Sequence, residues 1–192
     1  EEKEKEYKQQ GFHSIHPFEG SLVATGTGTL GLELLQQWPE CDIVISAIGG
    51  GGLCSGIAHA IHLIKPNCKI YGVEPSGANA MSQSFIEGTP IPHIDTDTIA
   101  DSLAAPCSLP YSFSLCQQHI AGIANITNTE VQQAMKFSFE HFKLALESAA
   151  ATTIAALHGP LKDICANKNV ILLACGSNID TLSYFKKLHH NT

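Results

Sequence analysis

The chain has 192 residues and a mass of 20.5 kDa, the size of one domain or of one large piece of a longer protein. Hydrophobic residues make up 44% and charged residues 15%, which supports a packed core and excludes wholesale disorder. The net charge is -7 and every positive residue is a lysine, so nucleic-acid binding is not expected. No apolar run is long enough to span a bilayer, and we therefore expect a soluble protein of the cytoplasm with no membrane partner.

Short apolar runs and glycine turns alternate with helical patterns along the chain. Continuous apolar runs predict buried strands at 43–48, 69–73 and 170–174, and a further strand is expected at 120–126. Segment 1–8 is expected to be a solvated helix end, and helical patterns lie at 30–37, 53–64, 78–87 and 149–158 and from about 181. Asn128 or Thr129 is expected to cap a helix that runs to about 144, and 88–111 is expected to be mostly loop. The repeated order of strand, glycine turn and helix predicts an α/β fold with a largely parallel sheet, formed by a single domain over 1–192.

Four consecutive glycines, Gly49, Gly50, Gly51 and Gly52, follow the strand predicted at 43–48 and precede a predicted helix that begins at Leu53. Glycines are entropically costly, so a run of four indicates that the backbone must come close to another group. Successive N–H groups at the start of a helix bind anions, and a phosphate held in this way needs no arginine. The alternative is a flexible tight turn, for which a single glycine would be enough.

Two other phosphate-binding motifs can be tested against the sequence. A P-loop needs Lys followed by Ser or Thr after its glycines, whereas Leu53 and Cys54 stand there. Gly26–Gly31 matches the dinucleotide pattern GxGxxG, but the next predicted strand ends at Ile48 without the acidic residue that would bind a ribose. We therefore interpret this glycine pattern as packing at the start of a helix and not as a nicotinamide site.

Seven short motifs occur in the order found in a known family: His16-Pro17-Phe18-Glu19, Gly26-Thr27-Gly28-Thr29, Gly49-Gly50-Gly51-Gly52-Leu53, Val73-Glu74-Pro75, Thr98-Ile99-Ala100-Asp101, Glu147-Ser148-Ala149-Ala150 and Cys175-Gly176-Ser177-Asn178. In this ordered set the chain resembles the fold-type II pyridoxal-phosphate enzymes, in the branch of threonine/serine dehydratases and serine racemases. The resemblance covers nearly the whole chain from about Gly11. It implies a three-layer α/β fold like that of the tryptophan synthase β subunit, and pyridoxal 5′-phosphate as the cofactor.

The resemblance also implies roles for individual residues. Gly49, Gly50, Gly51, Gly52 and the N–H of Leu53 would hold the cofactor phosphate, Cys175 would face the pyridine nitrogen, and Glu147 would lie near the ring. A neutral group such as Cys175 at the ring nitrogen suits β-elimination; the alternative for Cys175 is a buried structural thiol.

A divalent cation is a further expectation from the resemblance, with the Glu74 carboxylate and the Ala78 carbonyl as ligands. A third carboxylate would stand near position 80, where this chain has Ala80. The alternative for Glu74 is a surface residue beside a helix.

The family's Schiff-base lysine lies in an N-terminal part, and none of the eleven lysines here follows its motif. The chain is therefore expected to be most of the large cofactor domain of a longer enzyme, without the N-terminal elements and without a catalytic residue of its own. Such a piece would expose apolar surface and unpaired sheet edges, and we expect it to form a homodimer.

The resemblance implies β-elimination of L-threonine or L-serine, a small amino-acid substrate, to a 2-oxo acid and ammonia in the complete enzyme. Serine racemase is the alternative within the family. A non-catalytic module that binds pyridoxal phosphate or phosphate is the alternative from another class, if the chain is naturally this short. A nicotinamide oxidoreductase built on Gly26–Gly31 is a more distant alternative.

Overall fold

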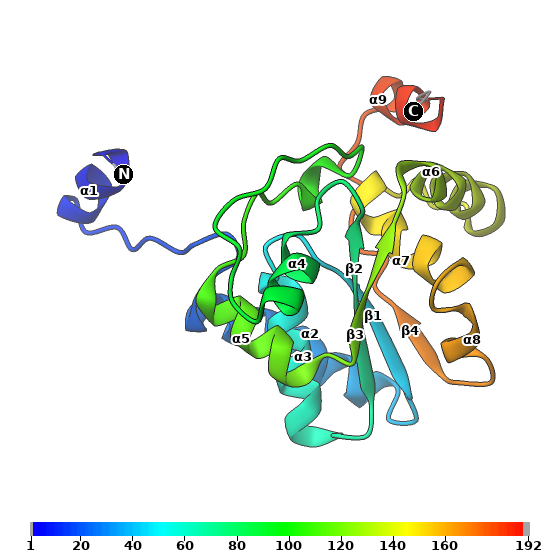
Figure 1. The fold of residues 1–192 in the computed structure, drawn as a ribbon, viewed down its shortest axis with the longest axis horizontal. Helices are drawn as coiled ribbons and strands as arrows, with labels where there is room; N and C mark the ends of the chain where they lie inside the picture. Colours follow the sequence, from blue (N-terminus) through cyan, green and yellow to red (C-terminus); the bar gives the residue numbers. More distant parts are fainter. Residues whose placement is uncertain (1, 190–192) are drawn as a thin grey trace.

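The computed structural model describes residues 2–189, and its centre is a four-stranded sheet (Figure 1). The strands β1 (Ile43–Ala47), β2 (Lys69–Pro75), β3 (Gly122–Ile126) and β4 (Val170–Leu172) stand in the order β3-β2-β1-β4. All neighbouring strands are parallel, and Ile43 of β1 pairs with Lys69 on one side and with Val170 on the other. The predicted α/β fold with a parallel sheet is thus confirmed, with β2 extending to Pro75 and β4 ending at Leu172.

Helices cover both faces of the sheet and make the fold three-layered (Figure 1). Alternate β1 side chains point to opposite faces, so Val44 packs in one apolar cluster while Ile43 and Ile45 pack in the other. The Val44 cluster includes side chains of α2 (Ser21–Gln37), α3 (Gly52–Ile64), α4 (Ala80–Glu87) and α5 (Pro110–His119). The opposite cluster includes side chains of α6 (Asn128–Phe137), α7 (Ser148–His158), α8 (Lys162–Cys165) and α9 (Thr181–Leu188).

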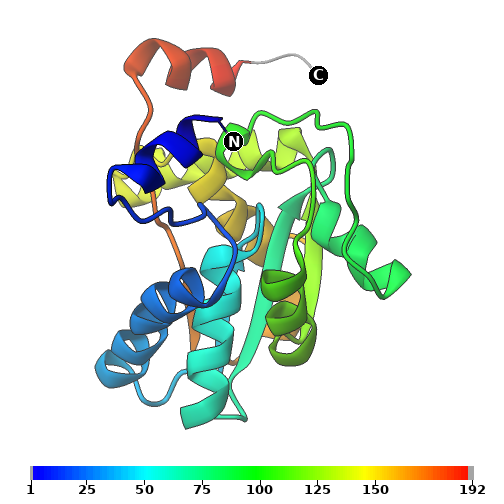
Figure 2. The same cartoon turned by 90° about the vertical axis from the view of Figure 1, so that its left-hand side faces the viewer.

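The two helices α2 and α3 pack side by side at very short range (Figure 2). A Cβ atom on Gly28 would lie 3.3 Å from the carbonyl oxygen of Gly56, and one on Gly31 would lie 3.0 Å from that of Ile57. The GxGxxG pattern therefore does serve packing. It lies inside α2 and not at its start, because the helix begins at Ser21 and not near Leu30.

Two further helices, α5 and α6, differ from the predictions. The helix α5 was not predicted from the sequence; Pro110 takes its first position, where a missing N–H costs nothing. The cap of α6 is Thr127, and neither Asn128 nor Thr129, because Thr127 forms a reciprocal capping box with Glu130. The helix then ends in a single π-helical turn, Ser138–Phe142, short of the predicted end at 144.

The polar helix α1 (Glu2–Gln9) lies apart from the body of the protein, at the end of an extended segment (Figure 1). This agrees with the solvated helix predicted for 1–8, of which Glu1 lies outside the described residues. Across residues 2–189, none of the helices combines the length and the apolar character that crossing a membrane requires.

Candidate functional site

A cavity of about 500 Å³ lies at the carboxyl edge of the parallel sheet, where open α/β sheets bind their ligands. Four stretches form its walls: residues 17–18, the glycine turn after β1, the segment 101–106, and the start of α7 together with Cys175 in the turn after β4. The seven residues predicted to bind the cofactor all line this one cavity: Gly49, Gly50, Gly51, Gly52, Leu53, Glu147 and Cys175.

The glycine turn leads directly into α3 and leaves the start of that helix uncapped. Gly51 is the N-cap, with φ 92° and ψ -6°, and no side chain caps the helix. The first N–H groups of a helix have no partner within it. Within residues 2–189 no acceptor takes the N–H of Gly52 or of Leu53. Both residues line the cavity at the positive end of the helix dipole, and this arrangement fits a phosphate group.

The same glycines allow the segment around Phe18 to lie against the turn. A Cβ atom on Gly50 would lie 2.2 Å from the Phe18 ring, and one on Gly52 would lie 2.6 Å from the Phe18 Cα. The hydroxyl of Ser112, in α5, donates a hydrogen bond to the Phe18 carbonyl. The four glycines therefore serve in part to let the Phe18 segment pack against the turn. The Phe18 segment also closes one side of the cavity.

The segment around Phe18 is held in place by α5. The Glu19 carboxylate accepts hydrogen bonds from the N–H groups of Tyr111 at 2.6 Å and Ser112 at 3.0 Å, and so satisfies the first turn of that helix. This contact joins residues more than ninety positions apart. It explains why the helix start at Pro110 could not be recognised from local sequence alone.

Glu147 and Cys175 meet because the start of α7 pairs with the turn after β4. The N–H of Glu147 donates to the carbonyl of Gly176 at 3.1 Å. Gly176 has φ 141°, and a Cβ atom there would lie 2.5 Å from Glu147 Oε1. Desolvation, aided by the nearby Glu147 charge, raises the pKa of the Cys175 thiol, although the residue is exposed overall. The group therefore stays a neutral thiol near pH 7, able to donate or accept a weak hydrogen bond.

The cavity wall formed by residues 101–106 contains residues to which the sequence analysis assigned no role. Asp101 ends one of the seven ordered motifs, and Ser102 follows it. The remaining positions, 103–106, carry no motif. Their place in the wall comes from the short 3₁₀ helix Asp101–Leu103, which brings the Leu103 backbone against Gly49.

Glu74 is fully buried, so the alternative of a surface residue is wrong. Its carboxylate accepts hydrogen bonds from the Met81 N–H at 2.9 Å, the Ser82 N–H at 2.8 Å and the Ser82 hydroxyl at 2.6 Å, all at the start of α4. Burial raises the Glu74 pKa to about 7, and these hydrogen bonds oppose the shift.

Across the described residues, no three His, Cys, Asp or Glu side chains form a metal-binding group. A cation at Glu74 and Ala78 stays a prediction. It would have to compete with the three donors at the start of α4.

These features define a cavity at the carboxyl edge of a parallel α/β sheet, with an uncapped helix start in its wall, and the comparisons with known proteins assign the family. The model of the family "Pyridoxal-phosphate dependent enzyme" matches residues 1–176. The phenylserine dehydratase of Ralstonia pickettii is 42% identical over 180 residues, which are 94% of this chain and 55% of that protein. The serine racemase of Dictyostelium discoideum is 34% identical over 185 residues, which are 95% of this chain and 57% of that protein.

Solved structures agree with this assignment. The processed threonine deaminase isoform 2 of Solanum lycopersicum superposes with a TM-score of 0.89 at 33% identity, over 95% of this chain and 54% of that one. Maize serine racemase gives a TM-score of 0.85 at 31% identity, over 95% and 56%. The chain belongs to the pyridoxal-phosphate-dependent enzymes of fold type II, and it spans about half the length of the relatives it matches.

Proposed function

We propose that this chain forms the phosphate-binding and ring-binding part of a pyridoxal-phosphate lyase that eliminates the β-hydroxyl of L-threonine or L-serine. One observation carries the proposal: seven residues spread from 49 to 175 in the sequence line a single cavity at the carboxyl edge of the sheet. When bound, pyridoxal phosphate supplies an electron sink that makes the α-proton of a joined amino acid acidic.

The chain's own residues would bind and orient that group. The N–H groups of Gly52 and Leu53 would donate hydrogen bonds to the phosphate oxygens. Cys175 would meet the ring nitrogen as a neutral thiol, because its raised pKa keeps the proton on sulfur. A neutral partner would leave the ring less electron-withdrawing than a carboxylate would, and this favours rapid loss of the β-substituent.

The substrate class has support from the relatives' names. Phenylserine dehydratase, threonine dehydratase, L-threo-3-hydroxyaspartate ammonia-lyase and serine racemase are all named for amino acids that carry a β-hydroxyl. We therefore infer a substrate of this class, with L-threonine or L-serine as the first compounds to test.

The base that removes the α-proton would come from outside this chain. No lysine is among the cavity-lining residues in the described part of the chain. A complete lyase would therefore combine these residues with the portion of the family fold that the match to the relatives leaves uncovered.

A chimera tests the proposal. This chain replaces the matched segment of the Ralstonia pickettii phenylserine dehydratase, and the product is assayed for 2-oxo acid and ammonia from L-threonine, L-serine and phenylserine. The intact relative is the positive control, and the chimera with Gly51→Ala is the matched negative control. A folded chimera that binds pyridoxal phosphate but forms no 2-oxo acid would contradict the lyase assignment.

Two alternatives give distinct results in the same experiment. A serine racemase would convert L-serine mainly to D-serine, which chiral chromatography separates. A non-catalytic binding module, the alternative from another class, would bind pyridoxal phosphate as an isolated chain and leave the chimera inactive.

The proposal includes a homodimer. Large apolar side chains are exposed on the helices, among them Leu22 at 69%, Phe185 at 57% and Phe139 at 53% of their accessible surface. Burying such side chains against a second copy would remove them from water. Light scattering should give about twice the chain mass of 20.5 kDa, and a clean monomer would contradict this part of the proposal.

A further inference from the structure

The Lys187 side chain of α9 joins two walls of the cavity from behind. Its ammonium donates hydrogen bonds to the Ile99 carbonyl at 2.7 Å, to Asp101 Oδ1 at 2.5 Å and to the Ser148 hydroxyl at 3.1 Å. An ammonium has three N–H donors, so these three acceptors satisfy it completely. The Lys187 side chain is only 22% exposed, whereas that of Asp101 is 78% exposed, so the two neutral acceptors, and not the ion pair alone, hold the ammonium in place.

Of the three acceptors, Asp101 lines the cavity, while Ile99 and Ser148 lie beside cavity-lining segments without lining the cavity themselves. Asp101 begins the wall formed by 101–106, and Ser148 follows Glu147 at the start of the other wall. The Ser148 hydroxyl also donates to the Ile99 carbonyl at 2.7 Å, so the two walls already touch at the point where the ammonium binds. The hydrogen bond from Lys187, aided by its positive charge, lowers the pKa of the Asp101 carboxyl group, which keeps the ion pair charged.

The helix α9 is attached independently of this ammonium. The side-chain amide of Gln132 donates to the Lys187 carbonyl at 2.8 Å, and the Tyr184 hydroxyl donates to the Met135 carbonyl at 3.1 Å. Both contacts use groups other than the Lys187 ammonium. Changing the Lys187 head group therefore leaves α9 in place and tests the three contacts alone.

We propose that Lys187 is a positioning residue for the cofactor cavity. Its ammonium holds the 101–106 wall and the start of α7 at a fixed separation. The inference rests on the proposed function, since it assigns the ammonium a role in cofactor binding. It also makes the distant helix α9 part of the site, although no residue of α9 lines the cavity among the described residues.

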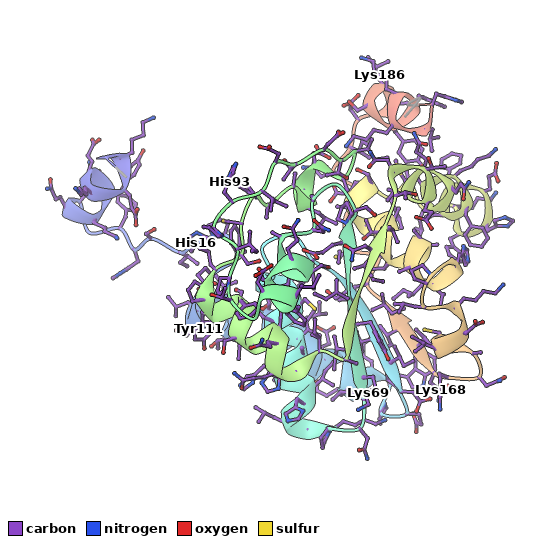
Figure 3. All side chains as sticks on the ribbon, viewed as in Figure 1. His16, Lys69, His93, Tyr111, Lys168 and Lys186 are labelled. Atoms are coloured by element: carbon purple, nitrogen blue, oxygen red, sulfur yellow. The ribbon has the colours of Figure 1, made fainter. Side chains whose placement is uncertain are left out.

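The test compares Lys187→Met, Lys187→Arg and the control Lys186→Met. Lys186 lies next in the chain on the outer side of α9 (Figure 3). Binding of pyridoxal phosphate is measured by equilibrium dialysis, the protection of amides 99–103 by hydrogen exchange, and the Asp101 pKa by carboxyl NMR. Thermal unfolding and the exchange of β1 amides show whether each variant is folded.

We expect Lys187→Met to weaken pyridoxal phosphate binding about tenfold, a typical loss when a supporting contact behind a site is removed. Amides 99–103 should exchange faster while β1 amides do not, and the Asp101 pKa should rise. Lys187→Arg should restore part of the binding, because its charge is kept, and Lys186→Met should match the wild type.

The outcomes separate the two proposals. Wild-type affinity and wild-type protection of 99–103 in Lys187→Met would overturn the positioning role. If the unmodified chain binds neither pyridoxal phosphate nor inorganic phosphate, the proposed function fails and so does the role in cofactor binding. The exchange and Asp101 measurements would then show whether Lys187 holds the wall for structural reasons only.

Discussion

Replacing Gly51 with alanine should damage both the stability and the phosphate site of this protein. Gly51 has φ 92°, a left-handed conformation that L-residues rarely adopt. Its backbone carries the chain from β1 into the uncapped start of α3. A Cβ atom there would also lie 2.7 Å from the terminal methyl group of Met81, which is fully buried.

The size of the effect follows from these two costs. Left-handed backbone costs an L-residue roughly 1–2 kcal/mol, and moving a buried methionine methyl adds about 1–2 kcal/mol of overpacking. The free energy of unfolding should fall by about 3 kcal/mol, which corresponds to a drop in Tm of about 6–12 °C for a chain of this size. If φ of residue 51 relaxed, the Gly52 N–H would turn away from the proposed position of the phosphate. The affinity for pyridoxal phosphate should therefore fall about tenfold.

The assay combines urea unfolding with equilibrium dialysis of pyridoxal phosphate, and Gly26→Ala is the matched control. Gly26 lies in α2, and a Cβ atom on it would have no other atom within 4 Å, so this variant should gain about 0.5–1 kcal/mol of stability. An unchanged stability of Gly51→Ala would refute the strain argument. Lost stability with unchanged pyridoxal phosphate affinity would refute the assignment of this turn to the phosphate.

Three further predictions follow from single contacts. Gly56→Ala should cost about 3 kcal/mol in urea unfolding, because its Cβ would lie 2.1 Å from Thr27 Oγ1; a stable variant would contradict the close packing of α2 on α3. Burial raises the Glu74 pKa from 4.5 to about 7, so the folded state holds this proton more tightly than the unfolded chain. Stability should therefore fall by about 3 kcal/mol between about pH 4.5 and 7, and Glu74→Gln should flatten that part of the urea-midpoint profile. Glu147→Gln should lower the Cys175 pKa and speed its alkylation by iodoacetamide at pH 8, as measured by peptide mass spectrometry; an unchanged rate would show that the two groups do not interact.

Local sequence predicted those parts of the fold in which the hydrophobic pattern of a segment matches the burial of its residues in the structure. The two central strands β1 and β2 are rich in buried residues and end at glycine or proline turns, which is the pattern that a parallel sheet covered on both faces requires. The start of α2 was missed because Gly26, Gly28 and Gly31 read as a break. Two of these glycines are instead required inside the helix, where α3 comes too close for a side chain at positions 28 and 31.

The missed boundaries have two different causes. The Thr127–Glu130 capping box was readable from local sequence, since threonine followed three residues later by glutamate marks a helix start. The start of α5 was only half readable. Pro110 suited a first helical position, but the acceptor for the next N–H groups is Glu19, which no local pattern connects with them.

For the candidate site, the sequence by itself determined the glycine turn, and the family resemblance added Glu147 and Cys175. Glycine runs and their position after buried strands follow from covalent geometry and backbone entropy, and both are local properties. Only the tertiary structure decided that these residues share one cavity, that Glu74 is buried beneath the first turn of α4, and that Lys187 braces the walls from α9. These facts depend on contacts between residues far apart in the chain, whose geometry is set by the packing of helices on the sheet and not by any segment alone.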